Sequence, residues 1–146
     1  MTQPLGRLWT RELGDELIRR INEDSKMAKL TAKLDETIQL RCFDTPDGTD
    51  VAARYKISRG VATLAEWVEE PAPSSFRNDK FDKRNLLART TAPYHVWVKL
   101  DKGEMGVIDA ILSPLYKFEG AKLKVLKNLR AFQRISELSQ EVPKTY

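Results

Sequence analysis

The chain has 146 residues, of which 41% are hydrophobic and 32% charged, and its formal net charge is +4. This composition is typical of a folded domain and excludes an extended disordered chain. No apolar run approaches the roughly 20 residues of a membrane span, and the N-terminus lacks the pattern of a secretory signal. We therefore expect one domain over residues 1–146, with its core at about residues 10–139, in a cytoplasmic protein.

The N-terminal segment has the spacing of helices. Large apolar residues recur there at every fourth position, at Trp9, Leu13, Leu17 and Ile21. On a helix, this spacing makes one apolar stripe. Asp24 or Ser25 can cap a second helix that continues to Leu34. The sequence thus predicts a bent helical arm before the first strand.

The pattern then changes to the alternation of half-buried strands. Three such segments follow one another at residues 37–43, 51–57 and 61–70, separated by short turns with glycine. Consecutive strands with short turns predict an antiparallel meander. Residues 71–85 are rich in Pro, Ser, Asn and charged residues, and this composition predicts a mobile surface loop.

The second half of the chain predicts short elements. A fourth strand is expected at residues 86–91, helices at 94–100 and 105–112, a fifth strand at 115–118 and a closing helix at 121–138. Neither short helix can bury its apolar face alone, so both must cover another part of the fold. The fold class that we predict is α+β, with a five-stranded, mainly antiparallel sheet covered on one face by helices.

The closing helix is expected to have an apolar and a basic side. At about 100° per residue, Val125, Leu126, Leu129 and Phe132 fall on one face. The basic residues of the other face are Lys124, Lys127, Arg130 and Arg134. Within residues 117–134, Glu119 is the single acidic residue. Such a local excess of positive charge indicates an anionic partner or surface.

Residues suited to catalysis or metal binding are scarce. The seven glycines are scattered singly, which excludes a glycine-rich phosphate loop. Cys42 is the only cysteine and His95 the only histidine, so disulfides and clusters of these ligands are excluded. We expect Cys42 to be a buried, inert thiol and His95 to lie on a helix surface. The sequence therefore predicts a protein without catalytic residues, metal or cofactor.

Residues 96–132 combine several short elements in a characteristic order. A short helix ends in "LDKGEM", and a second short helix, the strand "LYKFEG" and the helix "AKLKVLKNLRAF" follow. This order resembles that of the sterol carrier protein type two family. Gly103, Glu104 and Met105 match the break between the helices, and Gly120 matches the strand end. The resemblance covers about residues 10–139. Pro114 departs from the family, and the chain ends in "VPKTY" and not in a peroxisomal signal, which favours a stand-alone prokaryotic-type member.

The resemblance implies an apolar tunnel between sheet and helices that carries a fatty acid, acyl-CoA, phospholipid or sterol-like lipid without catalysis. Burying about 16 methylenes at ~0.8 kcal/mol each, against association costs of ~4–15 kcal/mol, corresponds to micromolar affinity. The expected lining residues are Trp67, Trp97, Leu100, Met105, Ile108, Ile111, Leu112, Val125, Leu126, Leu129 and Phe132. Lys124, Lys127, Arg130 and Arg134 are expected to meet a lipid head group or, transiently, an anionic membrane.

Other interpretations remain open at this stage. The apolar residues of the helices can be ordinary core, which makes the chain an accessory or protein-interaction domain of lipid metabolism with a vestigial cavity. The basic helix also allows a nucleic-acid-binding protein. No helix-turn-helix or RNA-binding signature accompanies it, so we do not expect a nucleic-acid partner.

Overall fold

A five-stranded sheet with the strand order β3-β2-β1-β4-β5 forms the base of the structure, a computed structural model that describes residues 3–146. The central strand β1 pairs antiparallel with β2 and parallel with β4. The outer strands β3 and β5 are antiparallel to their neighbours. The predicted α+β fold with a mainly antiparallel five-stranded sheet is therefore confirmed.

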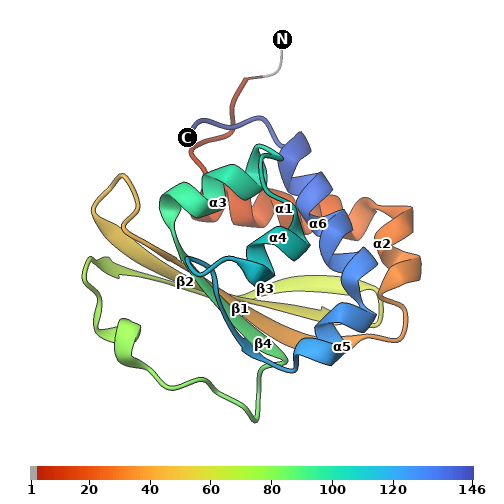
Figure 1. Cartoon of the computed structure of the whole chain (residues 1–146). Coiled ribbons are helices and arrows are strands. Elements are labelled where there is room, and N and C mark those ends of the chain that lie inside the picture. Colours follow the sequence, from red (N-terminus) through yellow and green to blue (C-terminus); the bar gives the residue numbers. More distant parts are fainter. Residues whose placement is uncertain (1–2) are drawn as a thin grey trace.

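The elements follow the predicted order along the chain. They are α1 (Arg11–Glu23), α2 (Ser25–Leu30), β1 (Asp35–Phe43), β2 (Thr49–Ser58), β3 (Val61–Pro71), the 3-10 turn η1 (Ser75–Asn78), β4 (Ala88–Pro93), α3 (Tyr94–Asp101), α4 (Val107–Leu112), β5 (Lys117–Gly120), α5 (Lys122–Lys127) and α6 (Leu129–Glu141). The α-helices gather on one side of the sheet, and the loop that carries η1 extends on the other side (Figure 1).

The alternation along β1 explains why the two faces differ. Ile38 and Leu40 point towards the helices, because successive side chains of a strand point to opposite faces. Arg41 points the other way, where it donates hydrogen bonds to the Thr91 hydroxyl and to the Phe76 carbonyl at 2.9 and 2.8 Å. The helix-facing side of the sheet is thus apolar, and the opposite side is polar.

Residues 72–87 cross the polar face and are attached to it. The carboxylate of Asp50, which is fully buried, accepts hydrogen bonds from the Ser74 backbone and hydroxyl and from the Arg77 guanidinium. Burial alone would raise the pKa of Asp50, but these bonds and one from the Asp44 backbone lower it well below its usual range. The segment predicted as a surface loop covers this face, and it is anchored by an ion pair whose carboxylate is buried.

The closing helix differs from the prediction because it is broken at Asn128. The backbone of Asn128, with φ −108° and ψ 22°, leaves the helical region between α5 and α6. A continuous helical projection from 121 to 138 therefore assigns wrong relative faces to residues on the two sides of the break. The second short helix also begins later than predicted, at Val107, where the Asp109 side chain accepts a hydrogen bond from Gly106 N.

Gly120 ends β5 where no side chain fits. A Cβ atom at this position would lie 2.4 Å from the Leu87 carbonyl oxygen, and the residue has a φ of +128°. The backbones of β4 and β5 approach closely at this point, and only glycine allows both the contact and the conformation.

Candidate ligand-binding cavity

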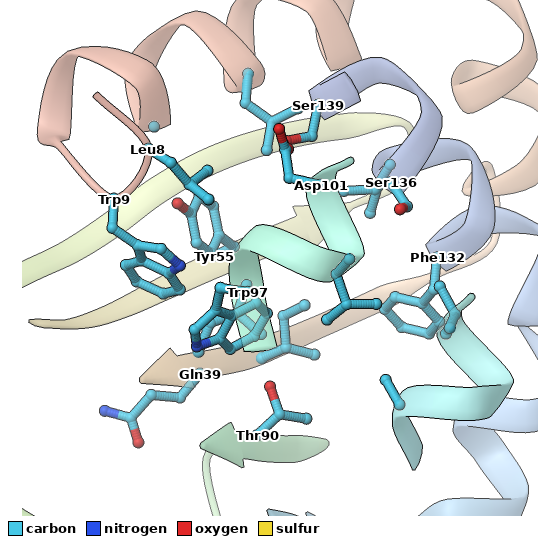
Figure 2. A pocket seen from close by; sticks show the side chains of 18 of the residues that line it. Leu8, Trp9, Gln39, Tyr55, Thr90, Trp97, Asp101, Phe132, Ser136 and Ser139 are labelled. Atoms are coloured by element: carbon cyan, nitrogen blue, oxygen red, sulfur yellow. The ribbon is translucent and has the colours of Figure 1, made fainter. Parts of the chain in front are cut away.

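A cavity of about 220 Å³ lies between the apolar face of the sheet and the helices. For comparison, an apolar protein cavity of ~150 Å³ is large enough to hold benzene. Its walls come from the N-terminal arm (residues 5–10), α1, all five strands, α3, α4, α5, α6 and the C-terminal tail (residues 142–146). Figure 2 shows aromatic and aliphatic side chains from these elements pointing into one space.

Aromatic rings close one end of the cavity. Trp9 packs edge-on against Trp97 with ring centroids 5.1 Å apart, and it lies 6.1 Å from Trp67. The ring of Tyr116 extends this row, 5.5 Å from Trp97. Edge-on and tilted aromatic pairs are favourable beyond the area that they bury. The row links the N-terminal arm, β3, α3 and the turn before β5.

Trp97 is held in one orientation by the sheet. Its indole Nε1 donates to the carbonyl oxygens of Arg41 and Ala92, each at 3.1 Å. These carbonyls belong to β1 and β4, so the bond fastens α3 to the ends of two neighbouring strands. With its N–H occupied, Trp97 presents only the apolar ring surface to the cavity.

The first helix reaches the sheet closely because of Gly14. A Cβ atom there would lie 3.3 Å from both the Trp67 ring and the Tyr55 hydroxyl. The stripe predicted from the four-residue spacing faces this side, since Trp9, Leu13 and Leu17 all line the cavity. The N-terminal helix is thus part of the wall.

A buried polar cluster closes another part of the cavity. The Asp101 carboxylate accepts hydrogen bonds from Lys144 Nζ at 2.6 Å, Ser139 Oγ at 2.6 Å and Tyr146 OH at 2.7 Å. The side chains of Asp101 and Lys144 are only 4% and 3% exposed. The C-terminal tail is therefore fastened to α3 over the cavity, and the N-terminal arm pairs with it through Leu8 N and the Thr145 carbonyl at 2.9 Å.

Thr90 brings an isolated hydroxyl to the wall. The residue is 7% exposed, and its Oγ1 has no hydrogen-bond partner within residues 3–146. Burial raises the pKa of the neighbouring Tyr116 to about 12, and its interaction with the Thr90 hydroxyl opposes part of this rise. Both hydroxyls are neutral at physiological pH.

The cavity brings together about half of the residues predicted to line a tunnel. Trp67, Trp97, Leu100, Ile111, Val125 and Phe132 are among its lining residues. These side chains come from β3, α3, α4, α5 and α6. Gln39 also borders the cavity, but Figure 2 shows its side chain pointing away from Trp97 and the helices.

The other predicted residues lie elsewhere. Met105 is in the turn before α4, and α4 turns Val107, Ala110 and Ile111 inward, so that Ile108 and Leu112 face outward with 46% and 75% exposure. A helix of one and a half turns has a single inward stripe, which explains this difference. Leu126 and Leu129 flank the break at Asn128, and neither lines the cavity.

The basic residues of the closing helices are not equivalent. Arg134 pairs with Asp24 at 2.8 Å and with Glu137 at 2.8 Å, and Lys124 pairs with Glu36. Lys127 and Arg130 are exposed and make no ion pair within the described chain. The predicted basic face is thus partly neutralised, because Asp24, which caps α2, and Glu36 of β1 lie against it.

Several lining residues were not predicted from the sequence. The N-terminal stripe and the alternation of β1 marked Leu13, Leu17, Ile38 and Leu40 as one-sided apolar residues, which was a usable signal. Thr90, Tyr116 and Lys144 had no such signal, since nothing local distinguishes them from surface residues. Their place depends on strand pairing and on the path of the tail.

The remaining candidates for chemistry lie outside the cavity wall. Cys42 is fully buried, and burial raises the pKa of its thiol far above the usual range. His95 is exposed on α3. Within residues 3–146, no helix is both long and apolar enough to span a membrane.

Known structures share this architecture. The chain superposes on a conserved hypothetical protein and candidate sterol carrier protein from Thermus thermophilus with TM-score 0.74 and 17% identity, covering 98% of this chain and 94% of that one. A sterol carrier protein 2 gives TM-score 0.74 and 18% identity over 93% and 99% of the two chains. A ubiquinone synthesis protein with a sterol carrier domain gives TM-score 0.53 and 12% identity, covering 91% of this chain and 92% of that one.

Sequence comparison adds no closer assignment. No protein-family model matches the chain, and no curated protein matches it. At identities below a fifth, the superpositions concern the fold, and they agree with the order of elements that the resemblance implied. The chain has the sterol carrier protein 2 fold.

Proposed function

We propose that this chain binds an apolar, lipid-like ligand in the cavity between sheet and helices and transfers it without chemical change. The observation that carries the proposal is the cavity of about 220 Å³ with a wall made mostly of apolar and aromatic side chains. The fold shared with sterol carrier proteins supports the same function. The proposed contacts are Trp67, Trp97, Leu100, Ile111, Val125 and Phe132.

The size and shape of the cavity bear on the length of the ligand. Its volume of about 220 Å³ exceeds the ~150 Å³ that holds benzene, and the cavity is not enclosed on all sides. A long chain can therefore extend through the open side or move the outer helices apart, and α4 and α5 are short helices of six residues each.

The binding proposal is tested by filling the cavity. Ala110 is 1% exposed and lines the space from α4, so Ala110→Leu adds three carbon atoms inside it. Native mass spectrometry of freshly purified protein should show a lipid-sized adduct, and this variant should lose it. The matched change Ala28→Leu on the exposed surface of α2 should keep the adduct. Equal adducts in both variants, or none in any protein at micromolar added lipid, would contradict cavity binding.

We also propose an anionic membrane as the surface where ligand is exchanged. Large apolar side chains are exposed on α4, in the turn after it and on α5, at Leu112 (75%), Leu115 (56%) and Leu123 (78%). Lys122, Lys127 and Arg130 accompany them without ion pairs within the described residues. Exposed leucines beside unpaired lysines fit the interface of an anionic bilayer, which offers both apolar and negative groups. Both helices also contribute to the cavity wall.

The magnitudes favour brief docking. Three basic residues contribute ~1 kcal/mol each at an anionic surface, and partial burial of each leucine adds ~1–2 kcal/mol. The total of ~6–9 kcal/mol corresponds to dissociation constants of roughly 0.3–40 μM, and association costs weaken the binding further. Cosedimentation with phosphatidylglycerol-containing vesicles should weaken strongly in Leu123→Ser and in Lys127→Glu, and in high salt. Leu30→Ser, an exposed leucine on α2, is the control. Binding that is unaffected by Leu123→Ser and Lys127→Glu would exclude this surface.

A further inference from the structure

The charged groups of the cavity leave no free counter-charge for an ionised group that is buried inside it. Asp101 and Lys144 are the only carboxylate and the only cationic side chain among the lining residues, and they bind each other at 2.6 Å. Ser139 and Tyr146 occupy further positions on the same carboxylate. An additional buried carboxylate or phosphate would therefore lack a counter-charge, which is strongly unfavourable in an apolar surrounding.

Thr90, in contrast, brings to the wall a fully buried hydroxyl without a partner among residues 3–146. Thr90 Oγ1 is buried without a hydrogen bond within the described chain, although most buried hydroxyls in proteins are satisfied. Thr90 stands between Leu40 and Phe118 in the sheet register, on the face that lines the cavity. Figure 2 shows its side chain directed from β4 towards Trp97 and the helices.

We infer that the ligand is uncharged and carries one hydroxyl or carbonyl group, which forms a hydrogen bond with Thr90. This inference rests on the proposed function of the cavity and specifies its ligand class. A threonine hydroxyl donates to a carbonyl and accepts from a hydroxyl, so both groups fit. Thr90 thus acts as the specificity-determining residue, and the apolar wall excludes fatty-acid anions and other ligands whose charged group would be buried.

Three probes of equal chain length distinguish the contribution of the polar group to binding from that of the apolar chain. These are 1-octanol, octanoate at pH 8 and 1-chlorooctane, and tryptophan fluorescence reports their binding because Trp9, Trp67 and Trp97 line the cavity. We expect 1-octanol to bind at least about tenfold more tightly than octanoate. Thr90→Val keeps the shape but removes the hydroxyl, and it should weaken 1-octanol by roughly tenfold while leaving 1-chlorooctane unchanged.

Two controls exclude a structural explanation. Thr63→Val changes an exposed threonine of β3 and should bind all three probes as the parent protein does. The melting temperature of Thr90→Val should be equal to or above that of the parent, because the substitution removes an unsatisfied buried hydroxyl. A large decrease in melting temperature would show that the hydroxyl has a structural role and would overturn the inference.

The remaining outcomes distinguish this inference from the proposed function. If 1-octanol and 1-chlorooctane bind but Thr90→Val changes neither, or if octanoate binds as tightly as 1-octanol, the role of Thr90 is wrong and the binding cavity remains. If none of the three probes binds to the parent protein, the proposed function fails, and the inference fails with it.

Discussion

Lys144 Nζ lies 2.6 Å from Asp101 Oδ2, and both side chains are almost completely buried. This pair joins the last residues of the chain to the end of α3, beside the cavity. A buried ion pair is expensive to break, because the remaining partner keeps its charge without compensation. The N-terminal arm is paired with the same tail, so this contact supports both segments.

We expect Lys144→Met to lower the free energy of unfolding by ~3–5 kcal/mol, because it leaves the Asp101 carboxylate buried without its cation. Combining it with Asp101→Asn should restore part of that loss, which chemical denaturation can measure. Lys99→Met, an exposed position on α3, should change little. A double variant as unstable as the single one would mean that the pair contributes by packing and not by charge.

Acid should weaken the attachment of residues 72–87. The pKa of Asp50 is lowered by its contacts with Arg77, the Asp44 backbone and Ser74 despite burial, so its contribution to stability is complete above the unfolded pKa of about 4. That contribution disappears as the pH falls below about 4 towards the folded value. Unfolding followed from about pH 7 to about pH 2 should show a smaller acid dependence in Asp50→Asn than in the parent. An identical pH profile would contradict the assigned pKa.

Two glycines with positive φ provide a matched pair. Gly48, with φ +75°, has no atom within 4 Å of an added Cβ, whereas Gly120 would bring its Cβ to 2.4 Å from the Leu87 carbonyl. Gly48→Ala should therefore cost only the conformational term of ~1–2 kcal/mol. Gly120→Ala should cost at least ~2 kcal/mol more, because the β4–β5 pairing must shift. Thermal unfolding of both variants measures the difference, and equal losses would argue against the close approach.

The two arginines of α6 should behave differently. Arg134 binds Asp24 through both Nε and Nη2, at 3.1 and 2.8 Å, and Asp24 also caps α2 by accepting from Met27 N. Arg134→Ala should reduce stability by ~1 kcal/mol. Arg130→Ala should leave stability unchanged and reduce only vesicle binding. If Arg134→Ala affects vesicle binding without affecting stability, Arg134 belongs to the membrane surface, as the sequence suggested.

Local patterns in the sequence determined the elements and their order. The four-residue spacing from Trp9 to Ile21 and the alternation at Ile38 and Leu40 are set by helix and strand geometry, which needs no tertiary information. The same alternation assigned these residues to one face. Glycine positions such as Gly120 marked turns and strand ends for the same reason. The fold class followed from this order.

Tertiary structure decided which apolar residues enclose the cavity. Leu112 and Leu126 resemble their neighbours Ile111 and Val125 chemically, and only the packing of α4 and α5 against the rest of the fold separates exposed from lining residues. Likewise, Arg134 and Arg130 differ only because Asp24, 110 residues earlier in the chain than Arg134, faces one of them. Burial and charge pairing depend on distant segments meeting in space, and local periodicity contains no information about that meeting.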